Sequence, residues 1–354
     1  MINKSYLLFA VVFAVSSGVC AFGQSKDPNA AEVLRRYKQS LSWQESVSMK
    51  VDTDVKAKGD FGPYADRDFV HIERHFIFRR DHGRTEWIGE ALFWAQEEKV
   101  DISKSSLIKE IMTGEQYMSL INPLNAAPLG AVISRDYKEH QENVLDSSDF
   151  CGPLFGRLPG ISHKGIAGLL GESNNLRLHD KQENLNGVSC YVLEATTKYG
   201  RVTAWISPEK GYNALKWVFE NSRDDLFDDA PLSAKWPELQ GGTSVFDCVE
   251  MQEIKDVNTV FVPKIARFTD TVKFTNGTNS GDQSDYTVSD IQIDPNFEAL
   301  GAFKIDLPNG TRVHVKESPG VHYIWQNGKI VPNVDAPNFK EIDKMVDEIK
   351  KEKK

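Results

Sequence analysis

The sequence is poor in cysteine, with four in 354 residues, and no two of them have C-x-x-C spacing. This excludes a disulfide-dense small domain and argues against a structural zinc site. One of the four, Cys20, lies in the N-terminal segment discussed below, which leaves Cys151, Cys190 and Cys248. Because this number is odd, at least one is unpaired within the chain. A bridge between Cys190 and Cys248 is geometrically conceivable, although a buried free cysteine is the more common arrangement.

Positive charge is also scarce. The chain has 42 Lys and Arg against 51 Asp and Glu, a formal charge of −9, and no basic cluster outside its extreme C-terminus. Neutralising phosphates needs clustered Lys and Arg, so we do not expect nucleic acid as a partner. The 40% content of hydrophobic residues is ordinary, and a chain of this length is able to bury a large core.

Recognisable catalytic motifs are missing as well. The sequence has no G-x-S-x-G, no phosphate-binding glycine loop and no cysteine with a local histidine partner. His71, Glu73 and His75 would project from one face of a strand at intervals of ~6.6 Å, which favours a solvated sheet face over a metal site. The paired acids 224–225 and 228–229 lack the ligand spacing of a calcium loop. We therefore predict no catalytic residue, no metal and no cofactor.

The N-terminus is typical of a signal peptide over residues 1–23. Lys4 precedes an apolar run from Tyr6 to Val15, and small residues then lead to a cleavage-like Ala21-Phe22-Gly23. The run is shorter than the ~20 residues that span a bilayer. We expect a periplasmic or other extracytoplasmic protein. The alternative is a lipid anchor on Cys20, since residues 17–20 loosely resemble a lipobox.

Beyond the signal, the patterns predict mostly β structure. A helix starting at Asp27-Pro28 places Val33, Leu34, Tyr37 and Leu41 on one face. Period-two runs and turn signals then indicate about ten strands, with a polar helical stretch at 134–143 and a short helix at 163–170 between them. The predicted strands cover 47–55, 69–80, 85–96, 116–121, 177–183, 188–196, 201–206, 214–220, 244–254, 260–274 and 286–293.

These elements predict a mainly β (α+β) fold: a large curved antiparallel sheet, or unclosed β-barrel, with a helical lid. We expect this half-barrel domain to occupy residues 24–300, and a C-terminal β-hairpin and amphipathic helix to occupy 301–354. Such a sheet either fills its inner face or keeps an apolar cavity there. The large side chains that we expect to line the cavity, unless they are simply core, are Ile88, Leu92, Trp94, Trp205, Leu215, Trp217 and Phe219.

One stretch carries a family resemblance. Residues 186–194 read NGVSCYVLE, and residues 199–211 read YGRVTAWISPEKG. This order of a glycine turn, a strand ending in Glu, a short Trp-Ile-Ser-Pro strand and a Lys-Gly turn resembles the central meander of the LolA/LolB-like superfamily of periplasmic lipoprotein carriers and RseB-type sensors. Over residues 28 to about 298, the resemblance implies an unclosed antiparallel β-barrel with a helical lid over a cavity for lipid acyl chains.

The leading functional hypothesis is therefore a non-catalytic, exported carrier or sensor that binds a lipid or the acyl chains of a lipoprotein. A second hypothesis is a cell-envelope module that binds a protein partner through residues 301–354 and carries no lipid. A third is a hydrolase with an unrecognised site. Partial burial of one acyl chain suffices for the first hypothesis, because each buried methylene contributes ~0.8 kcal/mol.

Overall fold

A computed structural model describes residues 28–59, 71–94, 105–113, 116–123, 130–134, 151–158, 165–227, 230–255, 259–318 and 321–333. The signal peptide at 1–23, most of the helix predicted at 134–143 and the C-terminal helix lie outside these residues. In the described part, no helix is long and apolar enough to cross a membrane.

The first helix confirms the N-terminal prediction with a shifted start. Helix α1 spans Ala30–Ser40, and the Asn29 side chain caps it by accepting a hydrogen bond from the Glu32 backbone N–H at 2.9 Å. The cap is thus Asn29, two residues after the predicted Asp27. The short 3-10 helix η1, Leu41–Glu45, continues α1 toward the sheet and buries Trp43.

Seventeen of the described strands form one sheet, and two short strands form a second. Each predicted strand has a counterpart, while β4, β6, β12 and β13 were not predicted and the predicted strand at 177–183 is split into β7 and β8. The strands are β1 Ser46–Gly59, β2 His71–Asp81, β3 Arg84–Trp94, β4 Ser106–Met112, β5 Tyr117–Pro123, β6 Ala131–Ser134, β7 Arg177–Leu178, β8 Glu183–Leu185, β9 Val188–Thr197, β10 Gly200–Ser207, β11 Asn213–Ser222, β12 Leu226–Phe227, β13 Ala230–Pro231, β14 Leu239–Lys255, β15 Thr259–Phe274, β16 Asn279–Ile293, β17 Arg312–Val315, β18 Tyr323–Gln326 and β19 Lys329–Pro332.

The pairing runs from β7 and β8 through β9, β10, β11, β14, β15 and β16 to β1, and then through β2 to β6. All of these pairs are antiparallel. The N-terminal strand thus lies in the middle of the sheet. Beyond β6, strand β17 pairs in parallel and leads to β18 and β19. The sheet is not closed into a barrel, which confirms the predicted fold class.

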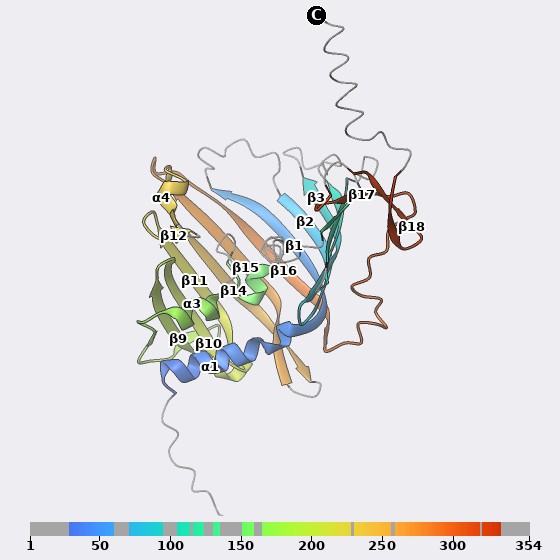
Figure 1. Cartoon of the computed structure of the whole chain (residues 1–354). Helices are drawn as coiled ribbons and strands as arrows, with labels where there is room; N and C mark the ends of the chain where they lie inside the picture. The colour runs from blue at the N-terminus through green and yellow to red at the C-terminus, as the bar shows by residue number, and fades with distance from the viewer. Residues whose placement is uncertain are drawn as a thin grey trace, which may run out of the picture.

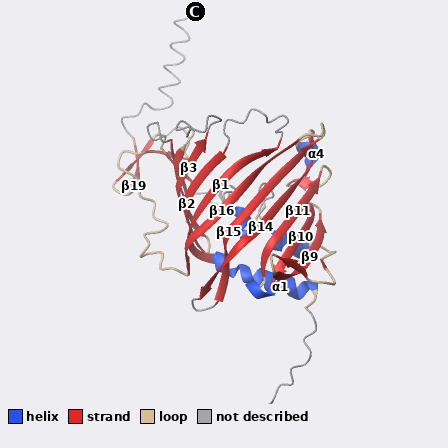
Figure 2. Ribbon diagram, turned by 180° about the vertical axis from the view of Figure 1, so that it is seen from behind, coloured by secondary structure: helices blue, strands red, loops and turns tan. Residues whose placement is uncertain are grey.

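One face of the sheet, called here the covered face, carries the helices. Helix α1 crosses the lower end of the sheet, and α3, Ile166–Glu172, lies over β9 and β10 (Figure 1). The 3-10 helix η4, Gly152–Phe155, adds Phe155, whose ring lies 5.1 Å from that of Phe78 on β2 and 5.7 Å from Trp43. The prediction of a short helix at 163–170 is confirmed, beginning at Ile166. The opposite face is called the outer face and is seen in Figure 2.

Strand alternation accounts for the core of the covered face. Trp217 on β11 is 1% exposed and packs against Phe246 on β14 and Phe268 on β15, with 5.7 Å between ring centroids in each pair. Its neighbour Lys216 lies on the outer face near Asp247. The same alternation places Val47, Met49 and Val51 of β1 under the helices.

A separate cluster lies at the β4–β6 end of the sheet. Here Ile111 and Met118, cross-strand partners on β4 and β5, are both fully buried. They pack in one cluster with residues 297–325, including Phe303 and Val313. This part of the C-terminal unit is therefore packed against the sheet and extends it through β17. The boundary at residue 300 stays a prediction.

Candidate ligand pocket

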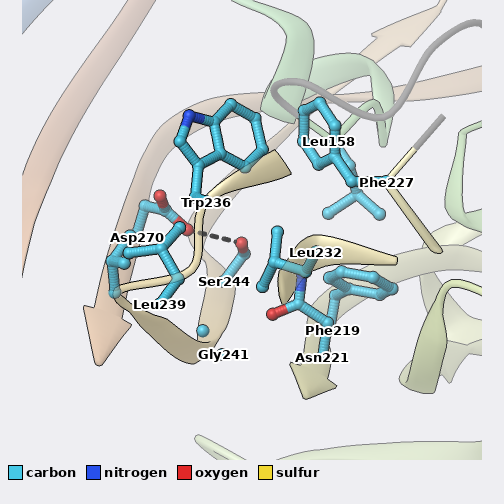
Figure 3. Close-up of a pocket in the computed structure, with 12 residues that line it drawn as sticks. Leu158, Phe219, Asn221, Phe227, Leu232, Trp236, Leu239, Gly241, Ser244 and Asp270 are labelled. Carbon is cyan, nitrogen blue, oxygen red and sulfur yellow. Dashed lines mark hydrogen bonds between the residues drawn. The ribbon is translucent and has the colours of Figure 1, made fainter. Parts of the chain in front are cut away.

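A pocket of about 300 Å³ lies on the covered face at the end of the sheet nearest α4, Leu232–Lys235. We call it the α4 pocket (Figure 3). Its floor comes from β11, β14 and β15, and its walls from Leu158, which follows η4, and from Phe227 and residues 232–239. The lining residues are Leu158, Phe219, Asn221, Phe227, Leu232, Trp236, Leu239, Gly241, Gly242, Ser244, Asp270 and Val272. This mix of apolar walls with few polar groups is typical of small-molecule sites.

Described residues of the acidic stretch 224–236, namely Phe227, Leu232 and Trp236, supply much of this wall. The backbone of this stretch folds back on itself, because the Leu232 N–H donates to the Asp225 carbonyl at 2.9 Å. Asp225 also accepts hydrogen bonds from the N–H and hydroxyl of Ser222 at 2.7 and 2.8 Å. These contacts turn Leu232 inward, where it is 5% exposed. Phe227 and Trp236 meet edge to face, with ring centroids 4.8 Å apart.

The floor of the α4 pocket depends on backbone that no larger residue could replace. Gly241 has φ of 144°, and a Cβ there would lie 2.3 Å from the Asn221 carbonyl oxygen. The adjacent Gly242 contributes no side chain, which leaves room above β14. Two glycines in succession therefore keep this end of the covered face hollow, whereas Phe246 fills the space further along β14.

The polar side of the α4 pocket is made by Ser244 and Asp270, cross-strand partners on β14 and β15. The Ser244 hydroxyl donates to Asp270 Oδ1 at 2.6 Å. Desolvation raises the pKa of Asp270, opposed by the Ser244 hydrogen bond; nearby Asp282 raises it further, and the Thr271 backbone N–H lowers it. A carboxyl group with a displaced pKa inside an apolar pocket marks a candidate site.

The seven residues predicted to line a cavity do not lie together. Phe219 lines the α4 pocket, and Trp217 belongs to the covered-face core. Trp205 lies on the outer face, where its indole N–H donates to Glu183 at 2.8 Å. The remaining members of the set, Ile88, Leu92, Trp94 and Leu215, are absent from the covered-face core.

The strand β3 explains three of these placements. Trp87, 2% exposed, packs against Phe78 with ring centroids 4.4 Å apart, so odd-numbered side chains of β3 lie on the covered face. Ile88, Leu92 and Trp94 therefore project to the outer face, and the expectation that they share a face with Trp217 is wrong. Trp94 stacks there on His71 at 4.9 Å between ring centroids.

A β-bulge explains the fourth. Trp205 pairs with Lys216, but Ile206 pairs with Ala214, so Leu215 is an extra residue in β11. The predicted common face for Leu215 and Trp217 is thus incorrect. Leu215 is buried in a different depression, lined also by Leu185, Val188 and Val249.

A second groove, of about 520 Å³, lies on the outer face across β1 to β5. Ile77, Ile88, Leu107 and Leu120 form its apolar part, and Leu107 is 48% exposed. Ile88 thus lines a groove, although not the one predicted. The groove is open along the sheet, whereas the α4 pocket is walled by segments from four parts of the chain.

The remaining chemical candidates are distributed as the sequence indicated. His71, Glu73 and His75 share the outer face, where His71 Nε2 lies 3.5 Å from Glu73 and His75 Nδ1 lies 2.7 Å from Asp52. Within the described residues, no group of three or more His, Cys, Asp or Glu side chains is arranged to hold a metal ion.

Cys151, Cys190 and Cys248 are all free, so Cys190 and Cys248 are not bridged in this structure. Burial raises the pKa of the Cys190 thiol to about 11 and that of Cys248 to about 12. Both thiols are therefore protonated and weakly nucleophilic at neutral pH. Cys190 packs as a small buried apolar side chain, in line with the more common arrangement considered from the sequence.

No family model and no curated protein matches the chain. Among solved structures, it is similar to a DUF1329 family protein from Desulfovibrio piger, with a TM-score of 0.36 and 11% identity over 77% of this chain and 95% of that one. It is also similar to lipovitellin, with a TM-score of 0.31 and 8% identity over 72% of this chain and 26% of that one.

Proposed function

We propose that this protein is an exported, non-catalytic carrier or sensor that binds the acyl chain of a lipid or lipoprotein in the α4 pocket. The observation that carries the proposal is the pocket itself. Six of its lining side chains, Leu158, Phe219, Phe227, Leu232, Trp236 and Leu239, are large and apolar, and they surround space that the rest of the covered face fills with protein.

The size of the α4 pocket fits one chain. About 300 Å³ is at the small end of ligand sites, which range from roughly 300 to 1,000 Å³. Burial of about ten methylenes at ~0.8 kcal/mol each contributes ~8 kcal/mol before ordering costs, and since a micromolar Kd requires about 8 kcal/mol net, the expected affinity is weaker than micromolar. Hydrophobic burial alone therefore supports reversible binding, as a carrier or sensor requires.

The sequence supports the same proposal independently. Residues 186–220 resemble the meander of LolA/LolB-like proteins, and this stretch forms β9, β10 and β11. The fold implied by that resemblance, an open antiparallel sheet with helices over one face, matches the fold class described above. The signal-like residues 1–23 support a periplasmic location after cleavage.

Filling the α4 pocket tests the proposal. Val272→Trp on β15 would place an indole in the pocket, and Ile265→Trp on the same strand is the matched control, since Ile265 is 36% exposed and absent from the pocket lining. The purified mature proteins are extracted with organic solvent and the extracts analysed by mass spectrometry. A fluorescent acyl probe is titrated in parallel.

We expect the wild type and Ile265→Trp to carry lipid and to bind the probe, and Val272→Trp to lose at least about tenfold in affinity, because the occupied volume is no longer open to an acyl chain. If the wild type carries no lipid and binds no acyl probe, the proposed function is wrong. Binding by Val272→Trp as tight as that of the wild type would show that the acyl chain binds outside the α4 pocket.

A further inference from the structure

The polar end of the α4 pocket presents hydrogen-bond acceptors. Among the twelve lining residues, Asp270 is the one with an ionisable side chain. Ser244 has already committed its proton to Asp270 Oδ1, as the dashed line in Figure 3 marks, so its oxygen offers lone pairs to a ligand. Asn221 is the one lining side-chain amide, and it is neutral.

The charges around this end are also predominantly acidic. Asp282 on β16 is the direct cross-strand partner of Asp270, which brings two carboxylates to adjacent positions on the covered face. Among the described residues, Lys235 of α4 is a cation near this end, and it does not line the pocket. Its ammonium lies over the rings of Phe227 and Trp236, at 4.4 and 5.0 Å from their centroids. The ammonium is thus engaged with two aromatic rings of the wall and is not one of the lining groups.

We propose that the α4 pocket selects amphiphiles whose polar end is a neutral or cationic hydrogen-bond donor, such as an amine, an amide N–H or a hydroxyl, over free fatty acids. This inference rests on the proposed function, because it concerns the head group of a chain bound in the same pocket. A donor would complete the hydrogen bonding of Asp270 and Ser244, with a cation forming the stronger, charge-assisted bond.

A fatty-acid carboxylate would be disfavoured for two physical reasons. It would bring a further negative charge beside Asp270 in a partly desolvated site, and like charges at short range repel there. It would also present acceptors to the acceptors of Asp270 and Ser244, leaving polar groups desolvated without partners. Selectivity of this kind arises from repulsion of the wrong ligand as much as from attraction of the right one.

The test compares three probes that share a dodecyl chain and differ in the polar group: dodecylamine, dodecanol and dodecanoate. Each is titrated into the mature protein by calorimetry below its aggregation concentration, at about pH 8, several units above the ordinary pKa of an aspartate. Asp270→Asn removes the charge while its amide oxygen still accepts from Ser244. Asp247→Asn on the outer face of β14, beside Lys216, is the matched control.

In the wild type and in Asp247→Asn, we expect the amine and the alcohol to bind at least about tenfold more tightly than dodecanoate. In Asp270→Asn, the amine should weaken and dodecanoate should tighten until the preference falls to within about threefold. Equal binding of all three probes to the wild type would overturn the selectivity and leave acyl binding standing. Failure of all three to bind would instead contradict the proposed function. The comparison of the three probes in the wild type tests the selectivity even if Asp270→Asn folds poorly.

Discussion

The two ends of the single sheet bury opposite faces. At the β11–β14 end, Trp217 and Phe246 are buried on the covered face, while Lys216 and Asp247 are on the outer face. At the β4–β5 end, Ile111 and Met118 are buried on the outer face. On their other side Glu110 accepts hydrogen bonds at 3.1 Å from Tyr117 and Ser119. The two larger cores of the described residues therefore lie on opposite faces of one sheet.

The difference follows from which segment covers each end. Helices α1, α3 and η4 pack over β1, β2, β9–β11 and β14–β16, whereas residues 297–315 and 323–325 pack over the outer face of β4–β6. Side-chain alternation supplies two possible apolar faces along a sheet, and the covering segment decides which one is buried. The α4 pocket lies in the first core, at the end that Gly241 and Gly242 leave unfilled.

The largest expected effect tests the first core. Trp217→Ala should lower the free energy of unfolding by about 3–5 kcal/mol, because it removes a large buried side chain and leaves a cavity between Phe246 and Phe268. Trp205→Ala on the adjacent strand is the matched control, expected to cost about 1 kcal/mol for one exposed hydrogen bond to Glu183. Chemical denaturation measures both. A Trp205→Ala cost equal to that of Trp217→Ala would mean that the buried face has been misassigned.

The second core is tested on a single strand. Ile111→Ala should cost about 2–4 kcal/mol, since Ile111 is fully buried against residues 297–325. Leu107→Ala lies four residues earlier on the same face of β4, beyond that cover and 48% exposed, so its cost should be about 0.5 kcal/mol. Comparable losses at both positions, measured by urea unfolding, would show that the cover extends over all of β4. For the same reason, truncation near residue 300 would expose Ile111 rather than simply remove a docking surface.

These two cores also explain which strands and which buried faces could be predicted from the sequence. Period-two patterns predicted β14, β15 and the Asn186-Gly187 hairpin because their apolar and polar positions alternate cleanly. β4 was missed because residues 106–112, SLIKEIM, carry apolar side chains on both faces. In β3 the alternation defined two sets correctly, but choosing between Trp87 and Ile88 required knowing where Phe155 of η4 packs.

The candidate site was harder to predict than the fold. The α4 pocket joins Leu158, Phe219, Trp236 and Asp270 from four separated segments, and no spacing along the chain relates them. The available signal was the apolar content of the acidic stretch 224–236, since a solvated loop has little need of Phe227, Leu232 and Trp236. The bulge that turns Leu215 away arises from pairing register, which single-strand alternation does not contain.

A smaller effect on the free energy of unfolding is expected in the α4 pocket than in the packed part of the first core. Asp270 has a pKa raised in the folded state by desolvation, with Asp282 on the facing strand contributing. A raised carboxyl pKa means that the folded state holds its proton longer than the unfolded state does. Its contribution is therefore favourable below the ordinary pKa and is lost as the pH rises through the raised value.

Asp270→Asn should accordingly gain stability over the wild type at neutral pH, on the order of 1 kcal/mol, and lose that gain near pH ~3.5. Asp285→Asn is the control on β16, because Asp285 pairs with Arg267 at 2.6 Å and its loss should not stabilise the protein. Thermal unfolding across this pH range measures both differences. A neutral-pH loss in Asp270→Asn as large as that in a core variant would assign Asp270 a structural role.

The smallest effect is expected one residue away from a large one. His75 and Phe76 are neighbours on β2, but Phe76 is 3% exposed on the covered face, whereas His75 pairs with Asp52 on the outer face with both side chains about half exposed. His75→Ala should therefore change the unfolding free energy by less than about 1 kcal/mol, and less again in high salt, because exposed ion pairs are screened. Phe76→Ala, by contrast, should cost about 3–5 kcal/mol.

Because His75 lies on the opposite face from the α4 pocket, acyl-probe affinity should be unchanged in His75→Ala. A purified protein that hydrolyses an ester or peptide substrate, and loses that activity in His75→Ala, would instead favour the hydrolase hypothesis over a carrier.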